Sequence, residues 1–208
     1  MARSKNSGFK MKRCFLIIPA LLFGLVQAQV NQPNRYGVRP LSIACERGDL
    51  EMVIKLLEQK ADPNAAQAGN ETPLMTAART GKVEIVKRLV DAGARIDEKE
   101  HQEQTALMWA AAEGHTEVVA FLIEKGAEFE KPLASGFTPL LFAVRQGHLA
   151  TAKLLIEQGA DVTQAAEVKR GGRKLMSDGT APLILAVENG HFELAAELLR
   201  LGDRKSVV

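Results

Sequence analysis

Three histidines of this 208-residue chain, His115, His148 and His191, directly follow a glycine, a regularity that a metal site could use. Imidazole nitrogens bind zinc at ~2.0–2.1 Å, so three ligand rings would have to converge on one point. These histidines are 33 and 43 residues apart and stand at the same place in a repeating pattern. Equivalent positions on neighbouring packed helices lie ~8–10 Å apart, too far to share an ion. We therefore expect no metal site.

Other residues that could do chemistry also lack partners. Cys45 has no histidine in its own repeat to remove its proton, and it stands where the next two repeats have Ala78 and Ala111, so we expect a packed thiol. The run Gly171–Lys174 lacks the spacing and the following Ser or Thr of a phosphate-binding loop. The sequence thus predicts no catalytic residue and no cofactor.

These residues belong to an internal repeat. A leucine recurs at intervals of 33, 33, 33 and 43 residues, at Leu41, Leu74, Leu107, Leu140 and Leu183. Thr-Pro or a related pair precedes it, small residues and then a glycine follow it, and a second apolar run comes next. A fixed period of this length indicates stacked supersecondary units.

Local physical chemistry predicts a pair of helices in each unit. A threonine hydroxyl can accept a hydrogen bond from a free N–H at a helix start, and proline is well suited to the first helical position. The glycine can take the left-handed conformation that ends a helix. In the second run, Val83, Val86, Leu89 and Val90 form an apolar stripe that one helix pair cannot bury alone.

These residues resemble the ankyrin repeat, whose pattern is G-x-T-P-L-H-x-A-A-x-x-G-H-x-x-V-V-x-x-L-L-x-x-G-A-D. The resemblance covers residues 34–203 as five tandem repeats, at about 34–66, 67–99, 100–132, 133–165 and 176–203. It implies an all-α fold, an ankyrin-repeat α-solenoid of stacked helix-turn-helix units with projecting hairpin-like loops, used for protein recognition. It also implies that the histidine after the glycine helps to tie a loop.

The chain departs from the family pattern in two ways. The histidine of the T-P-L-H segment is replaced by Ser42, Met75, Met108, Leu141 and Ile184, so we expect van der Waals packing to replace its hydrogen bonds between repeats. Lys60 stands where a helix-ending glycine is expected. A non-glycine residue in the left-handed region costs ~1 kcal/mol.

The longer last interval predicts an insertion loop at residues 164–178, which contains the basic run Lys169–Lys174. We expect it to be mobile and exposed. It is either a tolerated insertion or a contact for an acidic partner surface. Residues 203–208 have the character of a non-native tail, and we expect the natural protein to continue beyond Gly202.

Residues 1–28 have the features of a secretory signal peptide: basic residues, the apolar run Cys14–Val26, and a cleavage site after Ala28. A membrane anchor is the alternative, but a spanning helix needs ~20 apolar residues and this run has thirteen. Met11 would serve equally well as the first residue, which would leave residues 1–10 untranslated. We therefore expect a periplasmic or secreted protein with no membrane contact after cleavage.

The charge of the mature chain argues against binding to nucleic acid. Five of the 27 basic residues lie in residues 1–28, which leaves 22 against 25 acidic residues, a net charge of −3. Such a balance is not typical of proteins that bind nucleic acid or membrane surfaces. Cys45 is the one cysteine left after cleavage, so no internal disulfide can form. We expect a monomer.

A partner is expected to contact the loop tips before each Thr-Pro-Leu and the residues between the alanines and the glycine. A third series, Ile43, Thr76, Trp109, Phe142 and Leu185, recurs once per repeat. It is either an apolar groove for a peptide or a set of packing positions, with Trp109 the strongest candidate for exposure. The predicted contact residues are Tyr36, Arg47, Arg79, Thr80, Gln102, Gln104, Trp109, Glu113, Phe137, Phe142, Arg145, Gln146 and Glu188.

The sequence therefore predicts a non-catalytic protein–protein interaction module that is exported from the cytoplasm and binds a protein or peptide. The alternative is the partner-binding region of a larger exported enzyme or of a secreted effector. The identity of the partner does not follow from the scaffold, because such scaffolds carry many specificities.

Overall fold

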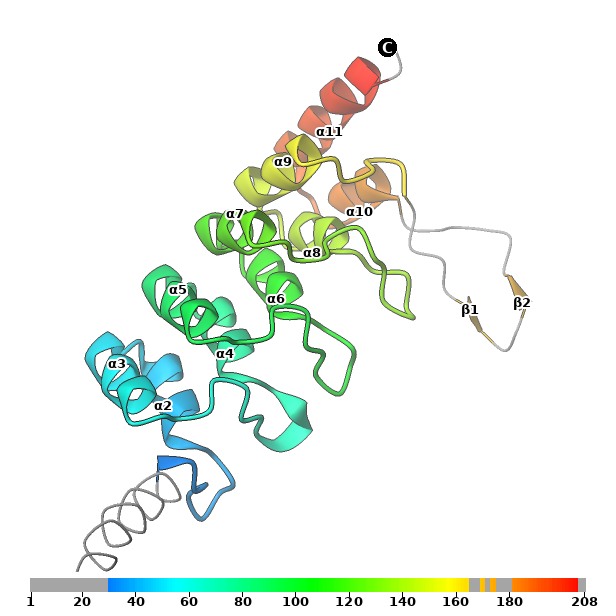
Figure 1. The fold of residues 1–208 in the computed structure, drawn as a ribbon. Helices are drawn as coiled ribbons and strands as arrows, with labels where there is room; N and C mark the ends of the chain where they lie inside the picture. Colours follow the sequence, from blue (N-terminus) through cyan, green and yellow to red (C-terminus); the bar gives the residue numbers. More distant parts are fainter. Residues whose placement is uncertain (1–29, 165–168, 171–172, 175–180, 206–208) are drawn as a thin grey trace, which may run out of the picture.

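The computed structural model describes residues 30–164, 169–170, 173–174 and 181–205. The predicted signal peptide, most of the predicted insertion loop, and residues 206–208 of the predicted tail lie outside this part. The described residues form a stack of helix pairs, and the loops that join one pair to the next project from one side of the stack (Figure 1). The predicted all-α solenoid of helix-turn-helix units is confirmed.

Each unit contains a short first helix and a second helix. The first helices are α2 (Pro40–Arg47), α4 (Pro73–Arg79), α6 (Ala106–Ala112), α8 (Pro139–Arg145) and α10 (Pro182–Glu188). The second helices are α3 (Leu50–Glu58), α5 (Val83–Asp91), α7 (Thr116–Glu124), α9 (Leu149–Glu157) and α11 (Phe192–Lys205). A short 3-10 helix, η1 (Ala68–Asn70), lies in a loop tip.

The described part of the insertion has regular structure where the sequence predicted a loop. β1 (Lys169–Arg170) pairs with β2 (Arg173–Lys174) as an antiparallel ladder. Its register places Lys169 opposite Lys174 and Arg170 opposite Arg173.

Threonine caps the first helices of the three interior repeats. The side chains of Thr72, Thr105 and Thr138 each accept a hydrogen bond from the N–H three residues further on. Arg39 and Ala181 occupy the same place in the first and fifth repeats and form no side-chain cap. Because such a cap contributes typically ~1 kcal/mol, the first helices of the two outer repeats have less local support.

In the second, third and fourth repeats, the glycine after the first helix is required by packing as well as by its left-handed backbone. A Cβ atom built on Gly81, Gly114 or Gly147 would lie 2.5–2.6 Å from the histidine ring of the next repeat. The φ angles of these glycines are +70° to +79°. A side chain is therefore excluded both by the backbone conformation and by the ring above it.

The same rings form hydrogen bonds between repeats, where we had expected van der Waals packing to replace those of the missing T-P-L-H histidine. Each histidine donates from Nε2 to a backbone carbonyl oxygen of the preceding repeat. These bonds measure 2.9, 3.0 and 3.1 Å and run from His115 to Arg79, from His148 to Ala112 and from His191 to Arg145. The histidine after the glycine thus supplies a hydrogen bond between repeats although the T-P-L-H histidine is absent.

A second set of hydrogen bonds between repeats was not predicted. A side-chain Oδ1 at Asn31, Asn64 and Asp97 accepts from the N–H of the residue 31 positions later, at 2.8 to 3.0 Å. The three acceptors are 33 residues apart, so a short polar side chain at the repeat interval was the available signal. The bonds of Asn64 and Asp97 hold the loop after one second helix to the next such loop, and the bond of Asn31 ties the segment before α2 to the loop after α3.

The apolar side chains form one continuous core along the stack. In the predicted stripe of α5, Val86 and Leu89 are buried, and Val83 and Val90 are partly buried. Ile85, next to this stripe, is buried as well. The second helix therefore buries a wider face than the stripe alone.

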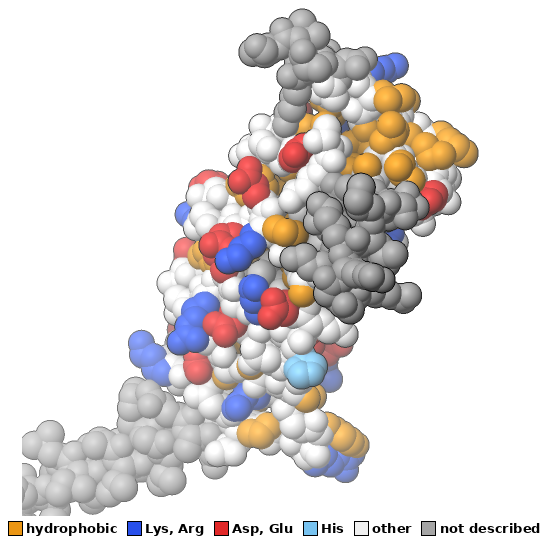
Figure 2. Space-filling view, turned by 90° about the vertical axis from the view of Figure 1, so that its right-hand side faces the viewer, with side chains coloured by type: hydrophobic (Ala, Val, Ile, Leu, Met, Phe, Trp, Pro, Cys, Tyr) orange, Lys and Arg blue, Asp and Glu red, His pale blue; other side chains and the backbone are white. Residues whose placement is uncertain are grey.

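The last helix pair presents an exposed apolar surface. Four large side chains there are between 49% and 69% exposed: Ile184, Val187, Phe192 and Leu199. Figure 2 shows hydrophobic side chains gathered at this end of the stack. We call these four residues the end face. Their counterparts in the fourth repeat pack against the fifth, and Leu141, Val144 and Ile156 among them are buried.

Lys60 takes the left-handed conformation, with φ of 64°, as the sequence predicted. The glycines at the same place in the next three repeats, Gly93, Gly126 and Gly159, also have positive φ. The first repeat therefore carries a backbone strain that the next three relieve with glycine.

Candidate protein-binding site

The loop tips are hydrogen-bonded turns that position the residue before each first helix. In four repeats, a backbone N–H donates to the carbonyl oxygen four residues later at 2.8 to 3.0 Å, closing the tips 34–38, 67–71, 100–104 and 133–137. The fourth residue of each tip has positive φ: Gly37, Asn70, Glu103 and Gly136. We call the surface formed by these tips and the first helices the inner face.

The residues that recur once per repeat on the first helices differ in how deeply they are buried. Thr76, Phe142 and Leu185 are buried, whereas Ile43 and Trp109 are partly exposed. The packing interpretation therefore fits the buried members of the series. Phe142, which we predicted as a contact residue, has 6% of its surface exposed, so its role on this surface is to support its neighbours.

An exposed arginine lies over two aromatic rings in the fourth repeat. The Arg145 guanidinium is 5.3 Å from the ring centroid of Phe137 and 5.1 Å from that of Phe142. The two rings lie 5.4 Å apart with a tilted geometry. Each exposed cation–π contact is worth ~0.5–1 kcal/mol, so the two rings restrict where the guanidinium can lie.

The second and third repeats contribute a similar pair. The Arg79 guanidinium lies 5.9 Å from the ring centroid of Trp109 and forms an ion pair of 3.5 Å with Glu71. The hydroxyl of Thr76 donates to the same carboxylate at 3.0 Å. We call these aromatic residues and arginines the aromatic–arginine cluster; it consists of Arg79, Trp109, Phe137, Phe142 and Arg145.

Glu71 was not among the predicted contact residues, although it holds Arg79 in place. It stands at the last position of its loop tip, where Gln104 and Phe137 stand in the next two repeats. Both of those residues were predicted, so the 33-residue spacing was the signal that would have found Glu71.

Trp109 has an unsatisfied donor. Its Nε1 atom is buried and makes no hydrogen bond to a described residue. Leaving a buried donor unpaired costs ~1–3 kcal/mol, although we had expected Trp109 to be the most exposed member of its series. The ring is therefore held by packing and by Arg79, not by a hydrogen bond.

The other predicted contact residues are spread along the stack. Tyr36 is 71% exposed, and the Arg35 guanidinium lies 4.7 Å from the centroid of its ring. Thr80 is partly buried, and its hydroxyl donates within its own repeat to the carbonyls of Thr76 and Ala77. Gln104 is partly buried, and the exposed ones are Arg47, Gln102, Glu113, Gln146 and Glu188. Within the described residues, their side chains form no hydrogen bond, ion pair or cation–π contact with the cluster, although the backbone N–H groups of Glu113 and Gln146 donate to the carbonyls of Trp109 and Phe142.

The described residues offer little for catalysis. Within these ranges, no group of three or more His, Cys, Asp or Glu residues is placed to hold a metal ion. Burial raises the pKa of the Cys45 thiol to about 12, although a backbone hydrogen bond acts in the opposite direction. The thiol therefore stays protonated near neutral pH and is a poor nucleophile.

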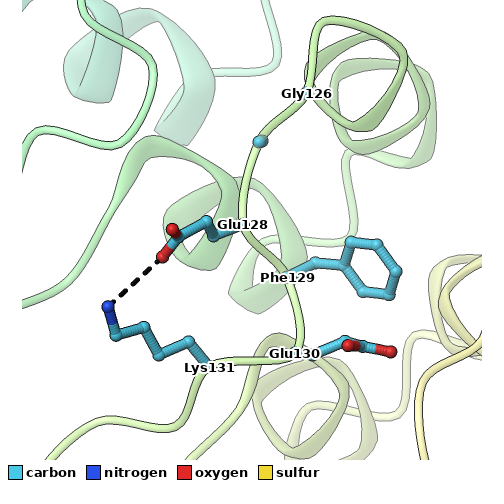
Figure 3. Close-up of a pocket in the computed structure, with 6 residues that line it drawn as sticks. Gly126, Glu128, Phe129, Glu130 and Lys131 are labelled. Atoms are coloured by element: carbon cyan, nitrogen blue, oxygen red, sulfur yellow. Dashed lines mark ion pairs between the residues drawn. The ribbon is translucent and has the colours of Figure 1, made fainter.

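A shallow hollow of about 510 Å³ lies along residues 126–131, after the second helix of the third repeat. Glu128 and Lys131 pair at 3.5 Å on one side of the backbone, and Phe129 and Glu130 point to the other side (Figure 3). Because these side chains point to opposite sides of the backbone, they cannot all contact one small ligand. The aromatic–arginine cluster is the better candidate for a binding surface.

None of the helices in the described part of the chain is both long and apolar enough to cross a membrane. A comparison with family models finds one described as ankyrin repeats (3 copies), which matches residues 14–100, 93–166 and 133–207. These overlapping matches run through most of the chain. A search of curated proteins found no match.

Proposed function

Because the chain belongs to the ankyrin repeat family, whose repeats serve as protein–protein interaction modules, we propose that it binds another protein or peptide through its inner face. The proposal assigns it no catalytic step. The observation that carries it is the aromatic–arginine cluster, in which Arg145 lies over two rings and remains exposed.

The geometry of this surface suits protein recognition. Tryptophan, tyrosine and arginine are the residues most often found at interface hot spots, and Trp109 and Arg145 are both present. The hydrogen-bonded tips and the capped helices hold the surface in place before a partner arrives. Little conformational entropy is then lost on binding, which favours affinity.

We also propose that the chain acts as a monomer outside the cytoplasm, in the periplasm or after secretion. The basic and apolar segments of residues 1–28 support export. Fusion of residues 1–28 to a reporter that is active only after export tests this proposal. Reporter activity would support it, and retention of the fusion in the cytoplasm would contradict it.

The binding proposal is tested by capture with the immobilised full chain. We expect a partner from the exported fraction to bind the wild type and to be lost from Phe137→Ala and Arg145→Ala. The matched control is Arg88→Ala on α5, an exposed arginine away from the loop tips that pairs with Glu84 at 3.8 Å. Unchanged retention of the same partners by both cluster variants would contradict the proposal.

A second candidate is that these repeats are the partner-binding region of a larger exported enzyme or effector. The exposed end face favours it, because the equivalent faces of the preceding repeats are covered by a further helix pair. Reading the genomic DNA downstream tests this candidate. An open frame with another domain would support it, and a stop codon within one more repeat would exclude it.

A further inference from the structure

We propose that the partner presents an acidic segment in extended form, with two carboxylates that bind Arg79 and Arg145 across repeats two to four. This inference rests on the proposed function and gives the chemistry of the partner. The two arginines stand at the same position of their repeats, 66 residues apart.

Arg145 is built to receive a carboxylate. Its guanidinium lies over Phe137 and Phe142, and it forms no ion pair with a described residue. Stacking on aromatic rings uses the faces of the planar guanidinium and leaves the N–H groups along its edge free. A carboxylate can accept two of these N–H groups side by side, which is the strongest form of this interaction.

Arg79 shows that the same position already binds a carboxylate. Its ion pair with Glu71 measures 3.5 Å, and both side chains are about one third exposed, at 35% and 31%. A partly exposed pair of this kind contributes little to stability, so a partner carboxylate can replace or join Glu71. The Trp109 ring keeps Arg79 near the inner face while this exchange occurs.

The spacing of the repeats defines the spacing of the acids. Neighbouring helices pack ~8–10 Å apart, so equivalent positions two repeats apart are separated by ~16–20 Å. An extended chain advances ~3.3 Å per residue, and side chains on one face recur every second residue. Two acidic residues at positions i and i+6 of the partner therefore match Arg79 and Arg145.

Acidic residues on the same surface limit the charge of the partner. Glu113 and Glu188, which are exposed near the ends of α6 and α10, would repel a peptide that is acidic throughout. The structure thus favours isolated acids at two places over a continuous acidic run.

The insertion supports an acidic partner independently. The two strands have the sequences Lys-Arg and Arg-Lys, so all four of their residues are basic. Both strands project from the same side of the stack as the loop tips (Figure 1). Basic residues on this side of the stack favour an acidic partner over a basic one.

The test measures binding of fluorescein-labelled twelve-residue peptides to the full chain. The probe has two glutamates at i and i+6 in a Ser/Leu background; matched peptides carry glutamine at both places or the second glutamate at i+3. We expect the i+6 glutamate peptide to bind at least tenfold more tightly than either, with an affinity that falls as salt rises. Arg79→Gln and Arg145→Gln should each weaken this binding about tenfold, while Arg88→Gln leaves it unchanged.

Equal binding of the glutamate and glutamine peptides would overturn the proposal, as would an equal loss in the Arg88→Gln control. Displacement of the peptide by single-stranded oligothymidine at lower concentration than by unlabelled peptide would also overturn it, because nucleic acid would then be the better occupant. Circular dichroism of each variant checks that the helices remain. If capture of a protein still depends on Phe137 while no acidic peptide binds, the acidic chemistry fails and the proposed function stands.

Discussion

The covered face of the fourth repeat and the exposed end face of the fifth are built from equivalent residues but have different surroundings. Leu141 and Val144 are buried under the fifth repeat, whereas Ile184 and Val187, at the same positions, are about half exposed. Gly147 lies against the ring of His191, and a Cβ on Gly190 would meet no described atom within 4 Å. The burial of a side chain in this fold is therefore set by the neighbouring repeat as much as by its own repeat.

The largest expected difference between a position covered by the next repeat and its counterpart on the end face is in thiol reactivity. Cys45 is buried with its pKa raised to about 12, and Val187 stands at the same position of the fifth repeat. At pH 8 we expect iodoacetamide to label a Val187→Cys thiol, measured in a Cys45→Ala background, about a thousandfold faster than native Cys45, because each pKa unit changes the thiolate fraction about tenfold.

The same pKa shift predicts a loss of stability in alkaline solution. Between about pH 9 and pH 12 the unfolded chain releases the Cys45 proton while the folded chain keeps it. The contribution of this thiol to stability is thus present below pH 9 and is lost as the pH rises toward 12. A Cys45→Ala variant whose unfolding free energy falls as steeply over this range would contradict the prediction.

The next largest effect is expected from one substitution made at two equivalent glycines. Gly114→Ala forces a side chain into the left-handed region and against the ring of His148, with roughly 4 kcal/mol lost from strain and displacement together. Gly190→Ala has the same φ problem but open space above it, so about 1 kcal/mol is expected. Urea unfolding monitored by circular dichroism compares the two, and equal losses would mean that the ring does not matter.

Shortening an apolar side chain should also cost more on the covered face of the fourth repeat than on the end face. Leu141→Ala removes a fully buried side chain and is expected to lower the unfolding free energy by about 3 kcal/mol. Ile184→Ala removes its exposed counterpart and should cost less than about 1 kcal/mol. Similar values for both variants would show that the end face is covered in solution, which size-exclusion chromatography with light scattering would then detect as an assembly.

The smallest effect is a gain in the first repeat. Lys60→Gly relieves a left-handed lysine at a place where the next repeats have glycine, and we expect a stabilisation of about 1 kcal/mol. The matched change Gly93→Lys introduces the same strain in the second repeat and should lower stability by a similar amount. The prediction is wrong if thermal unfolding of Lys60→Gly occurs at or below the wild-type temperature.

Much of the fold could be predicted because its causes are local. A threonine cap, a proline at the first helical position and a glycine at the helix end depend on neighbouring residues, and Thr72, Thr138 and Gly114 behave as expected. The burial of Cys45 followed from Ala78 and Ala111 at the same place in the next two repeats. Equivalent positions recur every 33 residues through the first four repeats, so the pattern of one unit helps to predict the next.

The unpredicted features depend on contacts between repeats. The hydrogen bonds accepted by Asn31, Asn64 and Asp97 join residues that meet only after the units stack. The sequence indicated Phe137 and Arg145 separately as contact residues, but not that the guanidinium lies over the ring. The ladder of β1 and β2 was not predicted, because a short run of lysine, arginine and glycine has no apolar alternation to indicate a strand.

Native-state hydrogen exchange tests the central claim most directly, because it measures the opening free energy of each helix in the unmodified chain. If neighbouring repeats supply most of the stability, amides of α6 and α8, covered on both sides, should exchange only by global unfolding. Those of α10 and α11 should exchange faster through local opening at the end face. Equal protection of α6 and α10 would contradict the claim.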